Sequence, residues 1–267
     1  MDKISDLVAL NLDPALMIQH DVMSRVKNVI NLRSLNGLRM MSVTTHTRLF
    51  SCVNPPCPSS NVTPRCSFLM ISFTNSSAAL IGSGDFHHLS LAILANIKIP
   101  FTLVVFDNHT DLMNMNKGYI SCGSWIRESF RLKWLKSVII IGVNPDDEAL
   151  KFIHPFSKPI HIILSRTQTS SKKMYEIIKE IKTKSLYVSI DKDVLNSACA
   201  STNWNQGSMD INELIDYLNI LIAAKKLIGM DICGEWKIYD KMFMSDYDIE
   251  AVRRNEAANI KILETVS

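Results

Sequence analysis

The stretch that decides the fold runs Phe101-Thr102-Leu103-Val104-Val105-Phe106-Asp107-Asn108-His109-Thr110-Asp111, an apolar run that ends in acids and a histidine. A continuous apolar run of this length is typical of a strand buried on both faces of a parallel sheet. Because extended backbone alternates its side chains, Asp107, His109 and Asp111 are expected to share one face. Ligands of open parallel sheets bind beyond the carboxyl ends of the strands. The stretch therefore predicts an α/β fold with its chemistry at this strand end.

Similar apolar runs recur from about Ser77 onward and alternate with helical patterns. The predicted strands are Ala78–Gly82, Phe101–Phe106, Ser137–Val143, Ile160–Leu164, Leu186–Ile190 and Leu227–Ile232. The predicted helices are His88–Asn96, Gly123–Trp134, Lys172–Thr183, Ile211–Ala224 and a last one from about Asp246 to Glu264, where Ser245 and Asp248 form a variant capping box. This alternation predicts a three-layer α/β/α fold with a mostly parallel central sheet.

The first 77 residues are poorly assigned, with Met40–Val43 and Phe68–Phe73 as further strand candidates. The Pro-rich stretch Cys52–Asn61 is expected to be a surface loop rather than a domain boundary, so residues 1–267 are expected to form a single domain. Three of the six cysteines gather in this region: Cys52, Cys57 and Cys66. Without a CxxC pair or a nearby histidine, reduced thiols are favoured over a small metal site there.

Composition narrows the functional classes. With 47% hydrophobic and 21% charged residues, the chain can bury a sizeable core. The formal charge of +3 is small and the basic residues are spread out, so no nucleic-acid partner is expected. No apolar run reaches the ~18 residues needed to span a bilayer, and Met1–Asp6 lacks the features of a signal peptide. We expect a cytoplasmic protein with reduced cysteines and no membrane partner.

Two more predicted strands end in side chains that bind metals. Asp191-Lys192-Asp193 follows Leu186–Ile190, and Gly82-Ser83-Gly84-Asp85-Phe86-His87-His88 begins where Ala78–Ile81 ends. Each motif alone reads most simply as loop acids and core histidines, but three such strand ends together favour a metal centre. Four aspartates at one sheet edge would repel one another unless cations compensated, and two divalent ions would balance them.

The ligand types indicate which metal and which chemistry. Carboxylate oxygen with some imidazole and no thiolate suits Mn²⁺, whereas structural zinc usually recruits cysteine. Two ions bridged by carboxylates hold a shared water, lower its pKa and direct the resulting hydroxide at an electrophilic carbon. The sequence therefore predicts a binuclear manganese hydrolase.

The three motifs, in this order, resemble those of the ureohydrolases, the arginase, agmatinase and formiminoglutamase family. Gly84–His87 resembles the family's Gly-Gly-Asp-His segment, Asp107–Asp111 its Asp-Ala-His-x-Asp, and Asp191–Asp193 its Asp-x-Asp. Gly229–Ile232 resembles the closing Gly-Leu-Asp-Ile strand, and the similarity covers roughly Ala78 to Glu235. The resemblance implies an arginase-like fold, a small-molecule substrate and a homo-oligomer.

The resemblance also implies a ligand set for two manganese ions. One ion would be held by His87, Asp107, Asp111 and Asp191. The other would be held by Asp107, His109, Asp191 and Asp193. Asp107 and Asp191 would bridge the ions and, with His109, belong to the catalytic residues. His88 competes with His87 for its role; the start of the following helix favours His87, which leaves His88 as a substrate contact.

Departures from the family pattern fall on the substrate pocket. Cys122 stands where the family has a proton-shuttling histidine, either as a thiol that transfers protons or as a small buried residue. Gly234 stands where the family has a guanidinium-binding glutamate, and Glu235 follows it. A one-residue offset turns the carboxylate to the other face, so Glu235 binds substrate only if the strand bulges or ends early. Thr202–Gly207 stands where the family has a Gly-Thr-Gly-x-Pro stretch, and its Asn203 and Trp204 are expected to shape a different pocket.

Three functions remain in competition. The first is hydrolysis of a C–N bond in a guanidino or amidino compound, a linear amidine, by the binuclear manganese centre. The second is a deacetylase-like amide hydrolase, which typically keeps one zinc with fewer aspartate ligands. The third is a metal-stabilised protein without turnover, supported by the absent shuttle histidine and the displaced glutamate. The metal count separates the first two, and turnover separates the first from the third. The sequence does not name the substrate, although arginine fits the altered pocket poorly.

Overall fold

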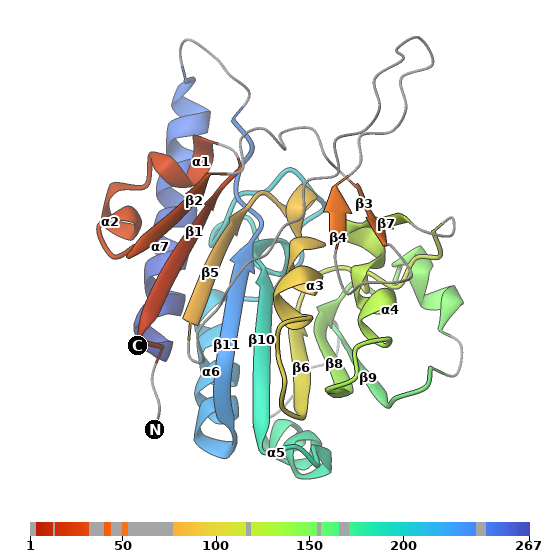
Figure 1. Cartoon of the computed structure of the whole chain (residues 1–267). Coiled ribbons are helices and arrows are strands. Elements are labelled where there is room, and N and C mark those ends of the chain that lie inside the picture. Colours follow the sequence, from red (N-terminus) through yellow and green to blue (C-terminus); the bar gives the residue numbers. More distant parts are fainter. Residues whose placement is uncertain are drawn as a thin grey trace, which may run out of the picture.

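A computed structural model shows the architecture of the chain (Figure 1). It describes residues 4–12, 14–31, 40–43, 50–52, 77–115, 119–153, 156–165, 171–238 and 244–267. The predicted strand Phe68–Phe73 and the thiols of Cys57 and Cys66 lie outside these ranges.

Eight parallel strands form one central sheet in the order β2-β1-β5-β11-β10-β6-β8-β9. Their bounds are β1 Asp6–Asn11, β2 Asn28–Asn31, β5 Ser77–Gly82, β6 Phe101–Phe106, β8 Leu135–Val143, β9 Ile160–Leu164, β10 Ser185–Asp191 and β11 Lys226–Cys233. A separate antiparallel sheet joins β4 (Phe50–Cys52), β3 (Met40–Val43) and β7 (Tyr119–Ser121). The parallel sheet predicted from the apolar runs is confirmed.

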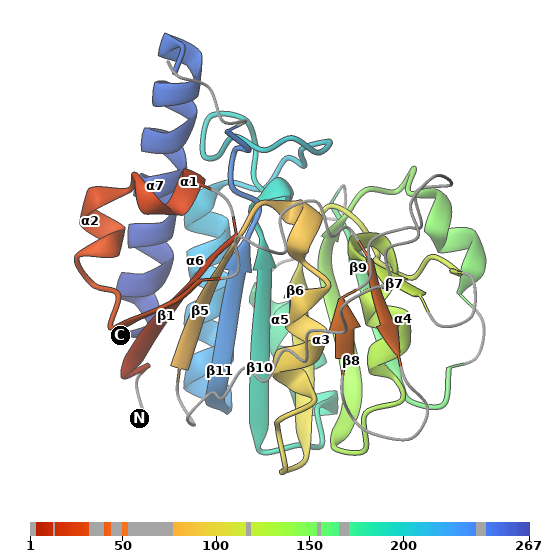
Figure 2. The same cartoon turned by 45° about the horizontal axis from the view of Figure 1, so that its top comes forward.

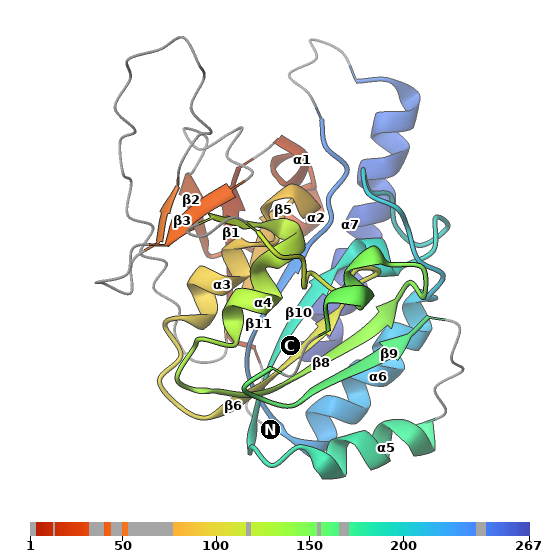
Figure 3. The ribbon, with the colours of Figure 1, turned by 90° about the vertical axis from the view of Figure 1, so that its right-hand side faces the viewer.

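Helices cover both faces of the sheet. Helices α3 (Leu89–Leu94) and α4 (Trp125–Ser129) lie on one face, whereas α5 (Ser171–Glu180), α6 (Ile211–Ala224) and α7 (Asp246–Val266) lie on the other (Figure 3). The short helices α1 (Pro14–Met17) and α2 (His20–Met23) lie beside α7 and β1 (Figure 2). The three-layer α/β/α prediction is therefore confirmed. Among the described residues, no helix combines the length and apolar character needed to cross a bilayer.

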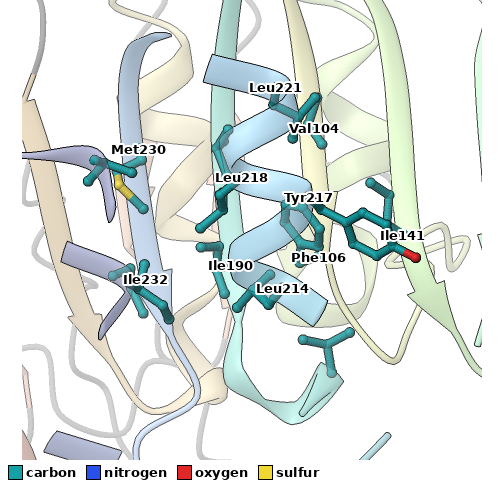
Figure 4. Packing of buried hydrophobic residues seen from close by; sticks show 14 of the residues in the cluster. Val104, Phe106, Ile141, Ile190, Leu214, Tyr217, Leu218, Leu221, Met230 and Ile232 are labelled. Atoms are coloured by element: carbon teal, nitrogen blue, oxygen red, sulfur yellow. The ribbon is translucent and has the colours of Figure 1, made fainter. Parts of the chain in front are cut away.

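Alternation along the strands creates two cores, one under each helical layer. In β6, Leu103 and Val105 pack with α3 and α4, whereas Val104 and Phe106 pack with α6. Figure 4 shows the second core, where Leu214, Leu218 and Leu221 of α6 meet side chains of β6, β8, β10 and β11. Their spacing puts them on one helical face. Full burial of each such side chain contributes about 1.5–3 kcal/mol, so the two cores hold the sheet between its helical layers.

The helix ends follow the capping signals in the sequence. Asp210 accepts a hydrogen bond from the backbone N–H of Asn212 at the start of α6, and the predicted capping box of Ser245 and Asp248 starts α7. Helix α4 is shorter than predicted because a 3-10 turn, Cys122–Ser124, precedes it and it ends at Ser129. Strands β1 and β2 were not predicted.

The strand order determines where the two aspartate motifs meet. After β6 the chain adds β8 and β9 on one side, then returns to place β10 on the other side. Parallel sheets open a crevice at the point where the strand order reverses, beyond the carboxyl ends of the strands. Here that point lies between β6 and β10, so the segments that follow Phe106 and Ile190 are neighbours.

Candidate metal centre

Three chain segments bring the predicted ligands to one side of this crevice. The odd-numbered residues of β6 face α3 and α4, and Asp107 continues that series beyond the strand. Asp191 ends β10 on the same face as Tyr187, which packs in the same core. His87 follows the 3-10 turn that leads from β5 into α3. The three motifs therefore converge at the carboxyl edge, on the α3 side of the sheet.

The first group of donors surrounds His87. Its Nδ1 lies 3.2 Å from Asp107 Oδ2, 3.3 Å from Asp111 Oδ2 and 3.6 Å from Asp191 Oδ2. All four side chains are buried. The donor atoms of His87, Asp107 and Asp111 lie within 4.8 Å of one another, a separation that a single ion can span.

The second group surrounds His109. Its Nδ1 lies 2.9 Å from Asp193 Oδ2 and 3.4 Å from Asp107 Oδ1, and these three residues form another set of donors within 4.8 Å. Asp107 thus directs Oδ2 to the first group and Oδ1 to the second. A carboxylate that faces two donor groups with different oxygens is placed to bridge two cations.

Asp191 takes a different position from Asp107. Its Oδ2 faces His87 and accepts a hydrogen bond from Cys233 Sγ at 3.2 Å, and these three residues form a third set of donors. Its Oδ1 accepts from the backbone N–H of Asp193 at 3.0 Å. The geometry groups Asp191 with His87 and not with His109, so its bridging role stays a prediction. Sequence reasoning missed Cys233, although it shares a strand face with Asp231 two residues earlier.

The cluster gathers four buried carboxyl groups around two histidines, more acids than the two imidazolium charges can balance when all are ionised. Burial opposes ionisation of Asp107, yet hydrogen bonds from His109 and His87 hold its pKa well below the usual range. Burial and the charge of Asp107 raise the pKa of Asp111 to about 7, and burial with the charge of Asp191 raises the pKa of Asp193. Burial disfavours the charged form of His109, but the carboxylates of Asp107 and Asp193 raise its pKa to about 12. Divalent cations would relieve this charge, and the nitrogen and oxygen donors present suit them.

A buried polar chain holds the ring of His87. Its Nε2 lies 2.9 Å from Ser189 Oγ, and that hydroxyl donates to Asp231 Oδ1 at 2.6 Å. Ser90 and the hydroxyl of Tyr187 also donate to Asp231, at 3.0 and 2.8 Å. With Nε2 engaged, Nδ1 is left facing the carboxylates, the arrangement by which outer hydrogen bonds orient a metal-binding imidazole. Ser189 lies two residues before Asp191 on the same strand face, and sequence reasoning missed it.

Two further contacts fix the aspartates. Trp125 Nε1 donates to Asp111 Oδ2 at 2.6 Å, and the backbone N–H of Asn108 donates to Asp193 Oδ1 at 3.1 Å. Asp111 adopts a φ of 51°, a left-handed conformation that aspartate tolerates better than most residues. The loop after β6 is thus held in a shape that turns Asp111 back toward His87.

His88, the predicted alternative to His87, takes no part in these donor groups. It is buried, and burial together with the charge of His87 lowers its pKa to about 4. It does not line the cavity over the cluster, so the geometry does not bring this predicted substrate contact to the site.

A cavity of about 320 Å³ opens over the two donor groups, and Cys122, Met113 and Trp204 form part of its wall. Burial, with the charges of Asp111 and Asp85, raises the pKa of Cys122 to about 12, which keeps the thiol neutral at physiological pH. The Trp204 ring stands edge-on to His109, with 6.1 Å between ring centroids. Asn203 does not line the cavity; its Oδ1 accepts from the backbone N–H of Lys237 at 2.5 Å.

Glu235 lies away from the cavity. Strand β11 ends at Cys233, and Gly234 adopts a φ of 84°, which turns the following chain toward α7. The Glu235 carboxylate forms a buried ion pair with Lys192. It also accepts hydrogen bonds from Gln19 and Asn259, each at 2.8 Å. The strand does end early, as a substrate role required, but it directs Glu235 to the opposite face. The structure therefore does not bring the predicted substrate contact Glu235 to the metal centre.

Comparison of the sequence with known proteins identifies a family and a relative. Residues 71–241 match the Arginase family. An uncharacterized protein of Thermotoga maritima is 33% identical over 166 residues, which are 60% of this chain and 61% of that protein. The chain thus spans about three fifths of the length of this relative.

Solved structures show the fold at low identity. The arginase of Bacillus caldovelox superimposes with a TM-score of 0.56 at 13% identity, over 97% of this chain and 98% of that chain. The formimidoylglutamase of Bacillus subtilis gives 0.52 at 18% identity, over 71% of this chain and 61% of that chain. The formiminoglutamase of Trypanosoma cruzi, solved with Mn²⁺, gives 0.52 at 12% identity, over 71% and 66%. The match to the family profile extends over more than half of the sequence, and the chain belongs to the arginase family.

Proposed function

We propose that this chain is a metal-dependent hydrolase that acts on a C–N bond of a small guanidino, amidino or related molecule. The observation that carries the proposal is the position of Asp107, whose two oxygens face two separate histidine-centred donor groups. Family relatives support the reaction class, since the names amidino hydrolase, agmatine ureohydrolase and formimidoylglutamase describe cleavage of such bonds.

The residues that would hold two manganese ions are the six nitrogen and oxygen donors His87, Asp107, His109, Asp111, Asp191 and Asp193. When bound, two divalent ions supply an activated water and polarise an electrophilic carbon. The protein's contribution is to fix the donors in advance. Ser189 orients His87, Trp125 holds Asp111, and the backbone N–H of Asn108 holds Asp193. Preorganised ligands keep coordination geometry constant through a reaction, which is the protein's main lever at a metal site.

The cavity walls bear on which substrates fit. Glu235, the acid next to the position where the family has its guanidinium-binding glutamate, pairs with Lys192 on the other face of the sheet. Asp85 pairs with Lys237 at 2.9 Å, and Asp147 accepts hydrogen bonds from the backbone of Thr110 and Ala149. Among the residues that the structure describes, the cavity wall therefore lacks the glutamate that arginine binding would use. We propose a substrate other than arginine.

The decisive experiment measures metal content and turnover together. The protein loaded with manganese should hold close to two ions per chain and release ammonia or urea from a member of a panel of guanidino, amidino and formimino compounds. Asp107→Asn should lose both properties, whereas Asp146→Asn, an exposed acid on a nearby loop, should keep them. A protein that binds no ion after careful loading would refute the proposal.

A second candidate is a metal-stabilised protein without turnover. Two observations favour it: the neutral thiol of Cys122 stands where the family has a proton-shuttling histidine, and Glu235 lies outside the cavity. This candidate predicts the same metal content with no product from any member of the panel. It also predicts that chelation lowers thermal stability, because a ligand at a hundredfold excess over its Kd stabilises the folded state by about 2.7 kcal/mol.

A further inference from the structure

The geometry points to Cys233 as a sulfur donor to the ion held by His87 and Asp191, which makes this site partly soft rather than purely oxygen and nitrogen. The inference rests on the metal centre proposed above and goes beyond it, because none of the six proposed ligands is a thiol. It concerns the choice of metal as well as the residues that hold it.

The position of Cys233 is set by the sheet. Cys233 ends β11 directly beside Asp191, its register partner at the end of β10. Its side chain is fully buried, on the face that carries His87 and the aspartates. The Sγ atom lies 3.2 Å from Asp191 Oδ2, and Sγ, this oxygen and a ring nitrogen of His87 all fall within 4.8 Å of one another. These three donors come from three different elements and face one point.

The backbone after Cys233 keeps the thiol in place. Gly234 turns the chain with a positive φ, and the backbone N–H of Glu235 then donates to Gly82 O at 3.0 Å. This hydrogen bond ties the end of β11 to the end of β5, from which the chain continues toward His87. Cys233 is therefore held between the two segments that supply the other donors, and a movement away from them would break the ties of β11 to β5 and β10.

The thiol packs at the edge of the apolar core and also contacts a carboxylate. A cysteine kept only for packing behaves as a small hydrophobic residue, whereas here its S–H donates to a proposed metal ligand. When an ion takes the place between these donors, the S–H bond breaks, the proton leaves to solvent and a metal–sulfur bond forms. Thiolate favours Co²⁺ and Zn²⁺ over Mn²⁺ by more than oxygen or nitrogen donors do. Cys233 should thus shift the preference of this site toward those ions.

Absorption spectroscopy with Co²⁺ tests this directly and needs no turnover. The natural protein titrated with Co²⁺ should develop a sulfur-to-cobalt charge-transfer band in the near ultraviolet, in step with metal content. Cys233→Ser should bind cobalt without the band. Cys122→Ser, whose thiol lines the same cavity, and Cys199→Ser, whose thiol lies partly exposed near Asp210, should keep it. Co²⁺ affinity should fall in Cys233→Ser by at least the ~10–100-fold that loss of an outer-shell partner typically costs, and Mn²⁺ affinity should fall by less.

The natural protein alone can overturn the inference, so misfolding of a variant does not weaken the test. Cobalt bound without a charge-transfer band would show that Cys233 only donates a hydrogen bond, while the proposed metal centre would stand. A band that persists in Cys233→Ser but disappears in Cys122→Ser would show that Cys122, and not Cys233, is the sulfur donor. That result would also overturn the inference. Failure to bind any ion would instead refute the metal centre itself.

Discussion

Gly234 offers the sharpest test of how the proposed metal centre is built, because it packs against Asp191 and Lys192 at the end of β10. Its φ of 84° lies in the left-handed region, and a Cβ added there would press on Asp191 Oδ1 and come within 2.7 Å of the Lys192 backbone nitrogen. Neither neighbour can move freely, since Asp191 accepts from the backbone of Asp193 and the nitrogen belongs to the chain between the two aspartates. Gly234→Ala should therefore damage both stability and metal binding.

The expected loss follows from two separate causes. A left-handed conformation costs a residue with a Cβ about 1–2 kcal/mol. Forcing extra atoms into a packed interior costs typically about 1–3 kcal/mol. Together they predict that Gly234→Ala lowers the free energy of unfolding by roughly 2–5 kcal/mol. Because the collision falls on Asp191, metal affinity should fall as well.

The measurement is denaturant unfolding of the metal-free and metal-loaded protein, with a second glycine as control. Gly123 also lines the cavity, but a Cβ there would meet only the flexible Met113 side chain, at 3.1 Å from its sulfur. Gly123→Ala should thus stay close to the natural protein in both states. The reasoning fails if Gly234→Ala changes the unfolding free energy by less than about 0.5 kcal/mol, the range of ordinary surface substitutions, and keeps its full metal content.

Three other predictions concern the ligands, the thiol and the buried ion pair. Asp107→Asn should lose both ions whereas His109→Ala should lose one first, as measured by elemental analysis at rising chelator concentration; equal losses would remove the distinction between bridging and terminal ligands. A thiol with a pKa of about 12 stays protonated below that pH, so Cys122→Ala should leave the pH profile of turnover unchanged from about pH 6 to 9; a loss of ~10²–10⁴-fold would instead mark a proton-transfer role. Lys192→Met leaves the Glu235 charge buried without its partner, which should lower the free energy of unfolding by about 3–5 kcal/mol. The double variant with Glu235→Gln should recover much of that free energy in denaturant unfolding; no recovery would mean that the two charges do not interact.

Six of the eight strands of the central sheet were predictable because their apolar runs are long enough to identify them. The runs Phe101–Phe106 and Ile160–Leu164 have the predicted bounds, since a proline precedes each run and a polar residue follows it. Strand β2 was not predicted because Asn28–Asn31 is short and mostly exposed, so its sequence shows neither an apolar run nor an alternation of apolar and polar residues. Strand β1 has only a brief apolar run, Leu7–Leu10, which fits a helix as well.

The candidate site divides in the same way. Clustered aspartates and histidines at strand ends predicted where the donors gather, because so many like charges repel one another unless cations compensate them. The sequence left two directions open for Glu235, because the one-residue offset turns its carboxylate to the other face whereas an early strand end could bring it to the site. The positive φ of Gly234, which glycine permits but does not require, is part of what decides between them. The roles of Cys233 and Ser189 were also not predicted, because a cysteine or serine in a buried strand gives the same sequence pattern whether it only packs in the core or contacts a metal ligand.

The place of β10 in the sheet has a kinetic consequence. Both of its edges are paired, to β6 on one side and β11 on the other, and these partners lie far apart in the chain. Such long-range closure is a slow part of folding, because its loop entropy must be overcome before the contacts form. Asp191 and Asp193 reach the other donors only after β10 has filled that gap. Metal binding should therefore follow folding and leave the folding rate nearly unchanged. Its stabilising effect should appear as a slower unfolding rate, because β10 would separate from β6 and β11 less often.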